Sequence, residues 1–313
     1  MPVFPKKLKK GDTIGIISPA GAVKDEKLWA SAIKYFENKG YKVKTAPHAG
    51  DKKAYLAGKD EDRLSDLINF FKDDEIKAVI CSRGGYGTYR LLEKIDWEII
   101  KNNPKIFVGY SDITALLNNF TEKSGLVCFH GPLALSDFGK EEINKYTEEN
   151  FWEILEGKAE IPYSFENPVN YECIIPGQAQ GESAGGNLTV LCGLLGTPYF
   201  PDLKGKILLL EDLEEPLYKI DRMLMQLKLA GVFEKVSGIL FGEFTSIIES
   251  ENPDVNKLTP VDIIKELTED LNIPVGYGFA ASHAVQKATL PLGVKYNFDS
   301  QNFKLEIVEN YLS

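Results

Sequence analysis

The hydrophobic positions in the first half of the chain alternate between short continuous runs and longer amphipathic segments. The continuous runs predict buried strands at residues 13–18, 41–46, 78–82 and 105–110. Between them, apolar positions spaced three or four residues apart predict helices at residues 26–38, 61–72 and 86–94. This β-α-β order predicts a parallel sheet with right-handed crossovers. Because the strands lack alternating polar positions, helices should cover both faces of the sheet.

The second half of the chain has a different pattern. Residues 147–177 mix charged residues, Asn and Pro with isolated aromatics and show no sustained period, which is typical of a linker. An apolar strand at 206–210 and an amphipathic helix at 218–230 follow. Two short alternating strands, at 294–298 and 303–308, indicate a sheet with one solvated face.

These patterns predict an α/β protein with two domains. We expect a flavodoxin-like, doubly wound and mostly parallel N-terminal sheet at residues 1–150 and a linker at residues 151–178. A second α/β domain with a mixed sheet should occupy residues 179–313.

Composition excludes several classes of protein. The chain has 313 residues, of which 43% are hydrophobic and 26% charged, as in ordinary globular proteins rather than disordered or fibrous ones. Its formal net charge of −10 argues against general attraction to nucleic acid or to anionic membranes. No run approaches the 18 apolar residues of a membrane span.

Two features bear on location. Lysines near the N-terminus precede mildly apolar residues 14–23, but Asp12 and Pro19 interrupt the apolar stretch, so we expect a strand rather than a signal peptide, and a cytoplasmic protein. The four cysteines are widely spaced without a CxxC pair, which predicts reduced thiols and neither a disulfide framework nor a zinc site.

Ser111 lies where an apolar strand runs into Gly-Tyr-Ser-Asp and then into a helical pattern. A serine in such a strand-turn-helix stands beyond the carboxyl end of its strand, in front of a helix N-terminus, where a nucleophile is well placed. The alternative is an ordinary N-cap, because serine is a favoured capping residue. This motif alone leaves both interpretations open.

A glycine-rich turn, Ser82-Arg-Gly-Gly-Tyr-Gly, also follows a strand and precedes a helix. It lacks the lysine of a phosphate loop and the spacing of a dinucleotide fingerprint, which argues against nucleotide binding. Its backbone N–H groups could approach an oxyanion or a carboxylate, although tight packing also explains the glycines. Arg83 is either an anion anchor or a structural arginine.

The chain has three histidines, His48, His130 and His283, so a general base has few candidates. His283 lies in a segment of small residues after an apolar strand, where it would be accessible. Glu211 directly follows the apolar strand at 206–210 and could orient an imidazole. The alternative is that Glu211 and Asp212 belong to a solvated acidic run, which is the usual environment of such residues.

Several motifs in this order resemble the LD-carboxypeptidases, serine peptidases that also include the microcin-immunity peptidases. The likeness covers nearly the whole chain. It rests on Gly11-Asp-Thr-Ile-Gly-Ile-Ile-Ser-Pro, Ser82-Arg-Gly-Gly-Tyr-Gly, Val108-Gly-Tyr-Ser-Asp-Ile-Thr, His130-Gly-Pro, Gly185-Gly-Asn-Leu, Leu210-Glu-Asp and Leu290-Pro-Leu-Gly.

The resemblance implies a catalytic triad in the order Ser, Glu, His, which here is Ser111, Glu211 and His283. It implies that Ser111 attacks the scissile carbonyl, His283 takes the proton and Glu211 orients the imidazole. The backbone N–H groups of Gly85 and Asp112 are then the expected oxyanion donors.

The implied reaction releases the terminal D-alanine from cell-wall tetrapeptides during murein recycling, without metal or cofactor, in an enzyme that is typically a homodimer. Arg83 and Lys287 are candidate anchors for the substrate carboxylate. One alternative is a microcin-immunity-like peptidase that cleaves peptidyl or aminoacyl nucleotides, with Trp152, Tyr163, Phe165 or Tyr171 as a platform for the base. Another is a peptide-binding protein without catalysis.

Overall fold

The structure, a computed structural model, describes residues 2–23, 25–254 and 257–313. The chain forms two compact units. Unit 1 contains residues 1–160, 289–293 and 310–313, and unit 2 contains residues 161–288 and 294–309.

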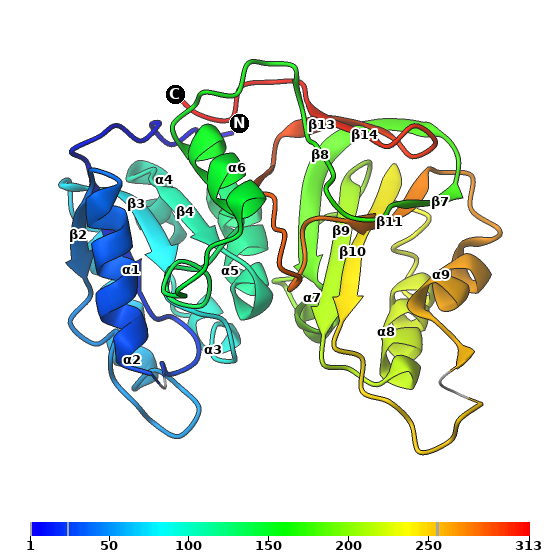
Figure 1. The fold of residues 1–313 in the computed structure, drawn as a ribbon, viewed down its shortest axis with the longest axis horizontal. Coiled ribbons are helices and arrows are strands. Elements are labelled where there is room, and N and C mark those ends of the chain that lie inside the picture. Colours follow the sequence, from blue (N-terminus) through cyan, green and yellow to red (C-terminus); the bar gives the residue numbers. More distant parts are fainter. Residues whose placement is uncertain (1, 24, 255–256) are drawn as a thin grey trace. The chain divides into compact units, whose positions relative to one another are not determined.

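Unit 1 is built on a six-stranded sheet in the order β12-β5-β4-β3-β1-β2 (Figure 1). Strands β1 to β5 are parallel to their neighbours, and β12 alone pairs antiparallel, with β5. The doubly wound, mostly parallel sheet predicted from the sequence is therefore confirmed. The strands are β1 (Thr13–Ile17), β2 (Lys42–Thr45), β3 (Ile76–Cys81), β4 (Ile106–Gly109), β5 (Cys128–His130) and β12 (Leu290–Leu292).

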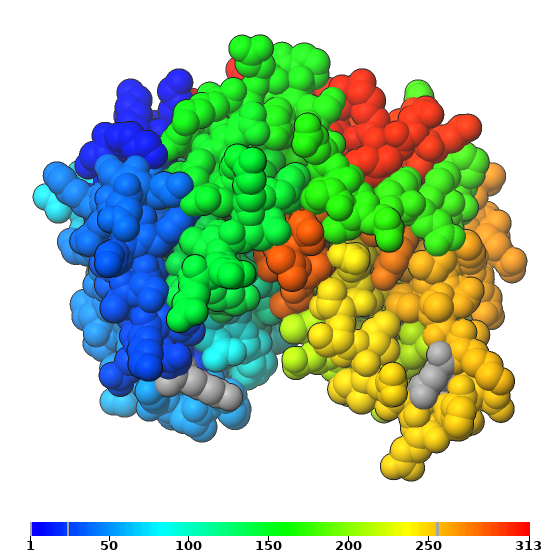
Figure 2. Space-filling view, viewed as in Figure 1, coloured from blue at the N-terminus to red at the C-terminus, as the bar shows by residue number. Residues whose placement is uncertain are grey.

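Helices cover both faces of this sheet (Figure 1). Helices α1 and α6 lie together on one face, where Trp152 Nε1 donates to the Tyr35 hydroxyl at 2.8 Å, and Figure 2 shows these blue and green segments side by side at the surface. The helical segments are α1 (Lys27–Asn38), α2 (Asp60–Lys72), α3 (Tyr89–Leu92), α4 (Trp97–Asn102), the 3₁₀ turn η1 (Ser111–Ile113), α5 (Thr114–Asn119), the π-helical turn η2 (Phe120–Ser124) and α6 (Lys145–Leu155).

Unit 2 contains an eight-stranded mixed sheet in the order β6-β14-β13-β8-β9-β10-β11-β7. Its centre, β8 to β11, is parallel, and the strands at both sides pair antiparallel. The alternating burial of β13 and β14 confirms the expected solvated face. The strands are β6 (Tyr163–Ser164), β7 (Glu172–Ile175), β8 (Gln178–Asn187), β9 (Ile207–Leu213), β10 (Gly238–Thr245), β11 (Val275–Phe279), β13 (Lys295–Asp299) and β14 (Lys304–Ile307).

Among its described residues, unit 2 has the α-helices α7 (Leu188–Leu194), α8 (Leu217–Leu229) and α9 (Pro260–Thr268). They cover a core made by the apolar runs of β9 and β10, with Leu208, Leu210 and Phe241 at its centre. A capping box at Thr259 and Asp262 satisfies backbone N–H groups at the start of α9. In the part of the chain that is described, no helix is both long and apolar enough to cross a membrane.

The units divide the chain differently from the expected boundaries. Residues 151–178 do not form a single connecting segment: they contain the end of α6, which belongs to unit 1, and strands β6 and β7 of unit 2. Trp152, for example, is buried and stacks on Tyr41 with ring centroids 4.9 Å apart. Residues 289–293 return to unit 1 because β12 takes its main-chain hydrogen bonds from β5.

The four cysteines have free thiols, as the sequence predicts. Cys81, Cys128 and Cys192 are buried and Cys173 is half-buried. Burial raises the pKa of the Cys81 and Cys128 thiols well above the usual value, which keeps them protonated and unreactive.

The core of unit 2 gives a direct test of its packing. Phe241→Ala removes a fully buried ring and should lower the free energy of unfolding by about 3–5 kcal/mol. The control Leu229→Ala truncates a side chain that is 81% exposed and should change it by less than about 0.5 kcal/mol. Urea denaturation measures both, and equal effects would contradict the assignment of Phe241 to the core.

Candidate active site

Ser111 occupies a strained turn at the carboxyl end of β4. The strand ends at Gly109, Tyr110 is extended, and Ser111, the first residue of η1, has a φ of 63°. Helix α5 follows η1 directly. Residues other than glycine rarely adopt this left-handed backbone conformation, and such strain is concentrated at functional sites. Gly109 permits the turn, because a methyl group there would lie 2.7 Å from Cγ2 of Ile113.

The N-cap interpretation of Ser111 is wrong. The capping positions of η1 and α5 are Tyr110 and Ile113, and in the described structure neither helix has a side-chain hydrogen bond at its N-cap. The serine is half-buried, so part of the residue remains exposed at the turn. This is the geometry expected of a nucleophile rather than of a capping residue.

The glycine-rich turn after β3 packs directly against Ser111. A methyl group on Gly84 would lie 2.6 Å from Cβ and 2.7 Å from Oγ of Ser111, distances that no side chain tolerates. The absence of a side chain at this position therefore lets the two turns meet. Gly84 also accepts a hydrogen bond from the backbone N–H of Gly21 at 3.1 Å, which adds the loop after β1 to the same edge of the sheet.

The other predicted residues of this turn lie close by. Gly85 is exposed and faces Gly21, so its backbone is accessible to a ligand. Arg83 is half-buried, and its Nη1 donates to the carbonyl oxygen of Ala22 at 2.8 Å. The guanidinium has five N–H donors, so this one contact leaves donors that could bind an anion.

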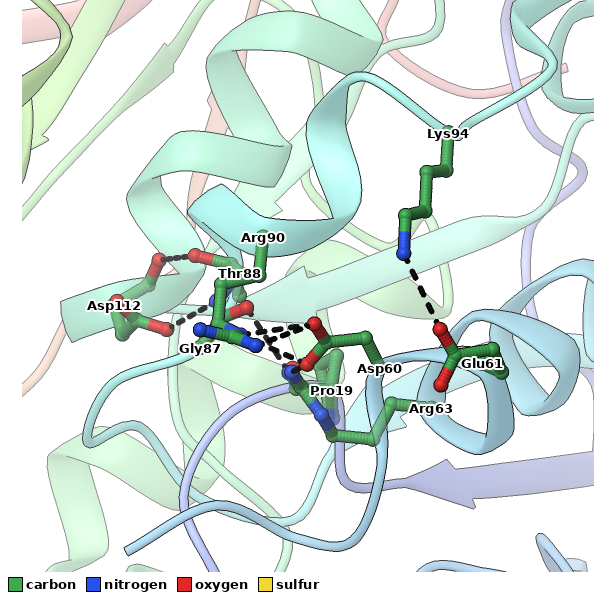
Figure 3. A network of polar contacts seen from close by, with 9 residues as sticks. All are labelled: Pro19, Asp60, Glu61, Arg63, Gly87, Thr88, Arg90, Lys94 and Asp112. Carbon is green, nitrogen blue, oxygen red and sulfur yellow. Dashed lines mark hydrogen bonds and ion pairs between the residues drawn. The ribbon is translucent and has the colours of Figure 1, made fainter.

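Asp112, which follows the serine, is buried and connects the two turns (Figure 3). Its Oδ2 accepts from the backbone N–H of Thr88 at 2.9 Å, and the Thr88 hydroxyl donates to the Asp112 carbonyl oxygen at 2.7 Å. Burial raises the pKa of Asp112 to about 6, against the opposing effects of Thr88 and of the Arg63 charge.

In unit 2 the structure brings Glu211 and His283 together. Nδ1 of His283 lies 2.7 Å from Oε2 of Glu211, a hydrogen-bonding distance. Glu211 is completely buried and the His283 side chain is 10% exposed. The other carboxylate oxygen, Oε1, is buried without a hydrogen-bond partner among the described residues, which leaves the carboxylate directed at the imidazole.

Local packing fixes this pair. A methyl group on Gly242 of β10 would lie 3.1 Å from Cβ of Glu211 and 2.8 Å from the carbonyl oxygen of Ala281, so a glycine is needed where the histidine loop approaches β9. A bridge between Ala281 and Lys287 closes the loop at its base. Lys287 is buried, and its Nζ donates to the carbonyl oxygen of Ala284 within the same loop.

Asp212 stabilises the end of β9 beside Glu211. It is buried and accepts from Asn187 Nδ2 at 2.8 Å and from the backbone N–H and hydroxyl of Thr189 at 2.9 and 2.7 Å. Burial raises its pKa. Glu211 and Asp212 are therefore not the solvated acidic run that their composition indicates.

The remaining candidates have other surroundings. His48 contacts Asp66, with Nδ1 2.9 Å from Oδ1, and His130 lies buried within β5. Of the four aromatics considered as a nucleotide platform, Trp152 stacks on Tyr41 in unit 1. In unit 2, Tyr163 packs on Phe165 and Tyr171 on Phe303.

Sequence reasoning missed the buried network beneath the Ser111 turn. Arg63, Thr88 and the Asp112 side chain make it (Figure 3). Arg63 follows the acidic residues Asp-Glu-Asp at the start of a helix, a context that predicts an exposed side chain. No local pattern indicates that it is buried. Asp112 directly follows the serine, and this adjacency was the one available signal.

The raised pKa of Asp112 predicts a pH-dependent contribution to stability. The folded pKa lies above the unfolded one, so as pH falls through 6 the folded state takes up the proton first and is stabilised. Between pH 8 and pH 5 the wild type should gain about 1 kcal/mol relative to Asp112→Asn, which cannot titrate. Urea denaturation at both pH values measures the difference, and parallel pH profiles would contradict it.

Comparisons with known proteins identify the family of the chain. Residues 14–131 match the family model of the LD-carboxypeptidase N-terminal domain, and residues 180–298 match that of the C-terminal domain. The chain is 38% identical over 291 residues to the "Probable murein peptide carboxypeptidase" of Bacillus subtilis, covering 93% of this chain and 90% of that protein.

Solved structures agree as well. The "Microcin C7 self immunity protein MccF" superposes with a TM-score of 0.93 at 30% identity over 100% of both chains. The "muramoyltetrapeptide carboxypeptidase from Oxalobacter formigenes" superposes with a TM-score of 0.85 at 31% identity over 96% of this chain and 100% of that one. The chain therefore belongs to the LD-carboxypeptidase family and is a hydrolase of the serine carboxypeptidase type.

Proposed function

We propose that this protein hydrolyses the bond between an L-configured diamino acid and the terminal D-alanine of free murein tetrapeptides. The observation that carries the proposal is the buried Glu211–His283 pair, 2.7 Å apart, in a chain that also holds Ser111 in a strained strand-turn-helix. Relatives named as murein peptide and muramoyltetrapeptide carboxypeptidases support this substrate class.

In the proposed reaction Ser111 Oγ attacks the scissile carbonyl carbon while His283 takes its proton. Because Nδ1 is engaged with Glu211, the proton goes to Nε2. The buried carboxylate of Glu211 stabilises the imidazolium that forms. Collapse of the tetrahedral intermediate breaks the C–N bond, the imidazolium protonates the leaving amine, and D-alanine departs. Water, deprotonated by His283, then attacks the acyl carbon. The ester C–O bond breaks, and the imidazolium returns the proton to Ser111 Oγ. These steps need neither metal nor cofactor.

The oxyanion of that intermediate needs N–H donors near Ser111. We assign this role to the backbone N–H groups of Asp112, the residue after the nucleophile, and of Gly85. The close packing of Gly84 on Ser111 supports the assignment, since it places the glycine-rich turn beside the serine.

Substrate binding requires an anchor for the free carboxylate of D-alanine, and Arg83 and Lys287 are our candidates. The exposed backbone of the neighbouring Gly85 supports Arg83. Lys287 shares a loop with His283, which supports it as a second anchor. We also place the enzyme in murein recycling in the cytoplasm, as a homodimer.

A second candidate function is cleavage of peptidyl or aminoacyl nucleotides, favoured by the TM-score of 0.93 to the microcin self-immunity protein. The packing of Trp152, Tyr163 and Tyr171 on other aromatic rings counts against a base platform made by these residues. The tetrapeptide reaction is therefore our first proposal.

D-Alanine release from free tetrapeptides with lysine or meso-diaminopimelate at the third position tests the function. Ser111→Ala should lower kcat by about 10⁴-fold or more, and His283→Ala with Ser111→Ala together should be no worse than either alone, because the residues act as a unit. The control Ser31→Ala changes an exposed helix serine and should be neutral. Release by Ser111→Ala at the wild-type rate would refute the nucleophile; cleavage of an aminoacyl sulfamoyl adenylate alone would favour the second candidate.

Gly84→Ala tests the close approach of the two turns. The added methyl group must displace Ser111 from its position, so kcat should fall by about 10²-fold. Gly50→Ala is the matched control, because a methyl group on Gly50 has no atom within 4 Å. Full activity of Gly84→Ala would show that the position of Ser111 does not depend on this contact.

A further inference from the structure

Arg63, on α2, is the largest fully buried side chain of the described structure and is 1% exposed. Arginine is rarely buried, because removing a guanidinium from water is costly unless its N–H groups and charge are compensated. Its compensating partners indicate what the residue does.

Two of these partners are backbone carbonyls in different loops. Nη1 of Arg63 donates to the carbonyl oxygen of Gly87 at 3.0 Å and also to that of Pro19 (Figure 3). Gly87 lies in the glycine-rich turn after β3, and Pro19 lies in the loop after β1. The guanidinium therefore links two loops at the carboxyl edge of the parallel sheet.

The third partner fixes the arginine itself. Nη2 of Arg63 donates to Oδ1 of Asp60, one helical turn earlier, at 2.6 Å. Arg90 also binds Asp60, with Nε 2.8 Å from Oδ1, but from the surface, where its side chain is 42% exposed. The two arginines thus share one carboxylate, and of these two Arg63 contacts the loop carbonyls (Figure 3).

The link continues from Gly87 to the nucleophile turn. Thr88, next to Gly87, is bonded to Asp112 through both its backbone N–H and its hydroxyl. The positive charge of Arg63 also favours the ionised form of the Asp112 carboxyl, the form that accepts the bond from the Thr88 N–H most strongly. Arg63 is therefore connected to the Ser111 turn by the buried Arg63–Gly87 and Thr88–Asp112 hydrogen bonds, since Gly87 precedes Thr88 and Ser111 precedes Asp112 in the chain.

We propose that Arg63 is a positioning residue for hydrolysis: it holds the loop after β1 and the glycine-rich turn in the arrangement that presents the backbone donors of Gly85 and Asp112 beside Ser111. The inference rests on the proposed function, because it assumes that these donors stabilise an oxyanion. Arg63 acts through Gly87, Thr88 and Asp112 and does not touch the substrate.

A positioning role differs measurably from a merely structural one. Interactions with an oxyanion exist in the transition state and not in the ground state, so their loss lowers kcat and leaves KM nearly unchanged. A merely structural arginine would instead change the fraction of folded protein, and the folded molecules would keep the wild-type kcat.

The test compares Arg63→Met, Arg63→Lys and the matched control Arg90→Met. Arg63→Met should lower kcat by about 10–10²-fold per folded molecule, with KM changed less than about threefold. Arg63→Lys keeps the charge but not the planar fork, so it should recover part of this loss. Arg90→Met loses a contact to the same Asp60 and should keep kcat within about twofold.

Labelling by a fluorophosphonate keeps this test separate from the choice of substrate, because the reagent reacts with an activated serine whose oxyanion donors are in place. The labelling rate at Ser111 should fall in the same order, Arg63→Met lowest, even if the tetrapeptide proves not to be the substrate. Urea denaturation gives the folded fraction of each variant. If Arg63→Met does not fold, kcat and the labelling rate of Arg63→Lys test the inference. Wild-type kcat and labelling in folded Arg63→Lys and Arg63→Met, or no labelling of the wild type at Ser111, would overturn the inference.

Discussion

The left-handed backbone of Ser111 is the constraint on which the site in unit 1 depends. A φ of 63° is unfavourable for serine by about 1 kcal/mol or more, so the surrounding structure must hold it. Two glycines make this possible, Gly109 by leaving room for Ile113 and Gly84 by letting the next turn touch the serine. The hydrogen bonds between Thr88 and Asp112 then fix the turn from below. Position, rather than any unusual residue type, is what distinguishes this serine from the others in the chain.

In unit 2 the corresponding constraint is the orientation of the His283 imidazole by the Glu211 carboxylate. An imidazole must be held in one orientation by a carboxylate, and a buried carboxylate is costly unless it has a partner. Glu211 lies in the buried part of β9, and Gly242 on the neighbouring strand lets the histidine loop come close enough for a 2.7 Å contact. Asp212, one residue further, is satisfied by Asn187 and Thr189. Two adjacent acids in the sequence thus have separate partners: Glu211 contacts His283, and Asp212 accepts hydrogen bonds from Asn187 and Thr189.

The region beneath the Ser111 turn in unit 1 contains two buried ionisable groups, which are costly to remove from water. Asp112 is held with a pKa raised to about 6, and Arg63 is buried with its Nε lacking a partner among the described residues. Such groups are retained where function needs a fixed charge or a directed donor, at a cost in stability that the apolar cores must offset. The apolar runs of β3, β4, β9 and β10, buried almost throughout, supply that stabilisation.

The sequence by itself determined the fold class and the residues of the proposed triad. Strands β1, β3 and β4 could be predicted because each is a continuous run of apolar residues in the sequence. The motifs around Ser111, Glu211 and His283 could be recognised because each consists of consecutive residues. Only the tertiary structure decided that β12 joins the sheet of unit 1, that α6 belongs to unit 1 and that Arg63 is buried. These facts depend on partners far away in the chain: β5 for β12, Tyr41 for Trp152, and the carbonyls of Pro19 and Gly87 for Arg63. A short strand or a single arginine carries no local pattern that identifies a distant partner, and its partner is fixed only when the chain has folded.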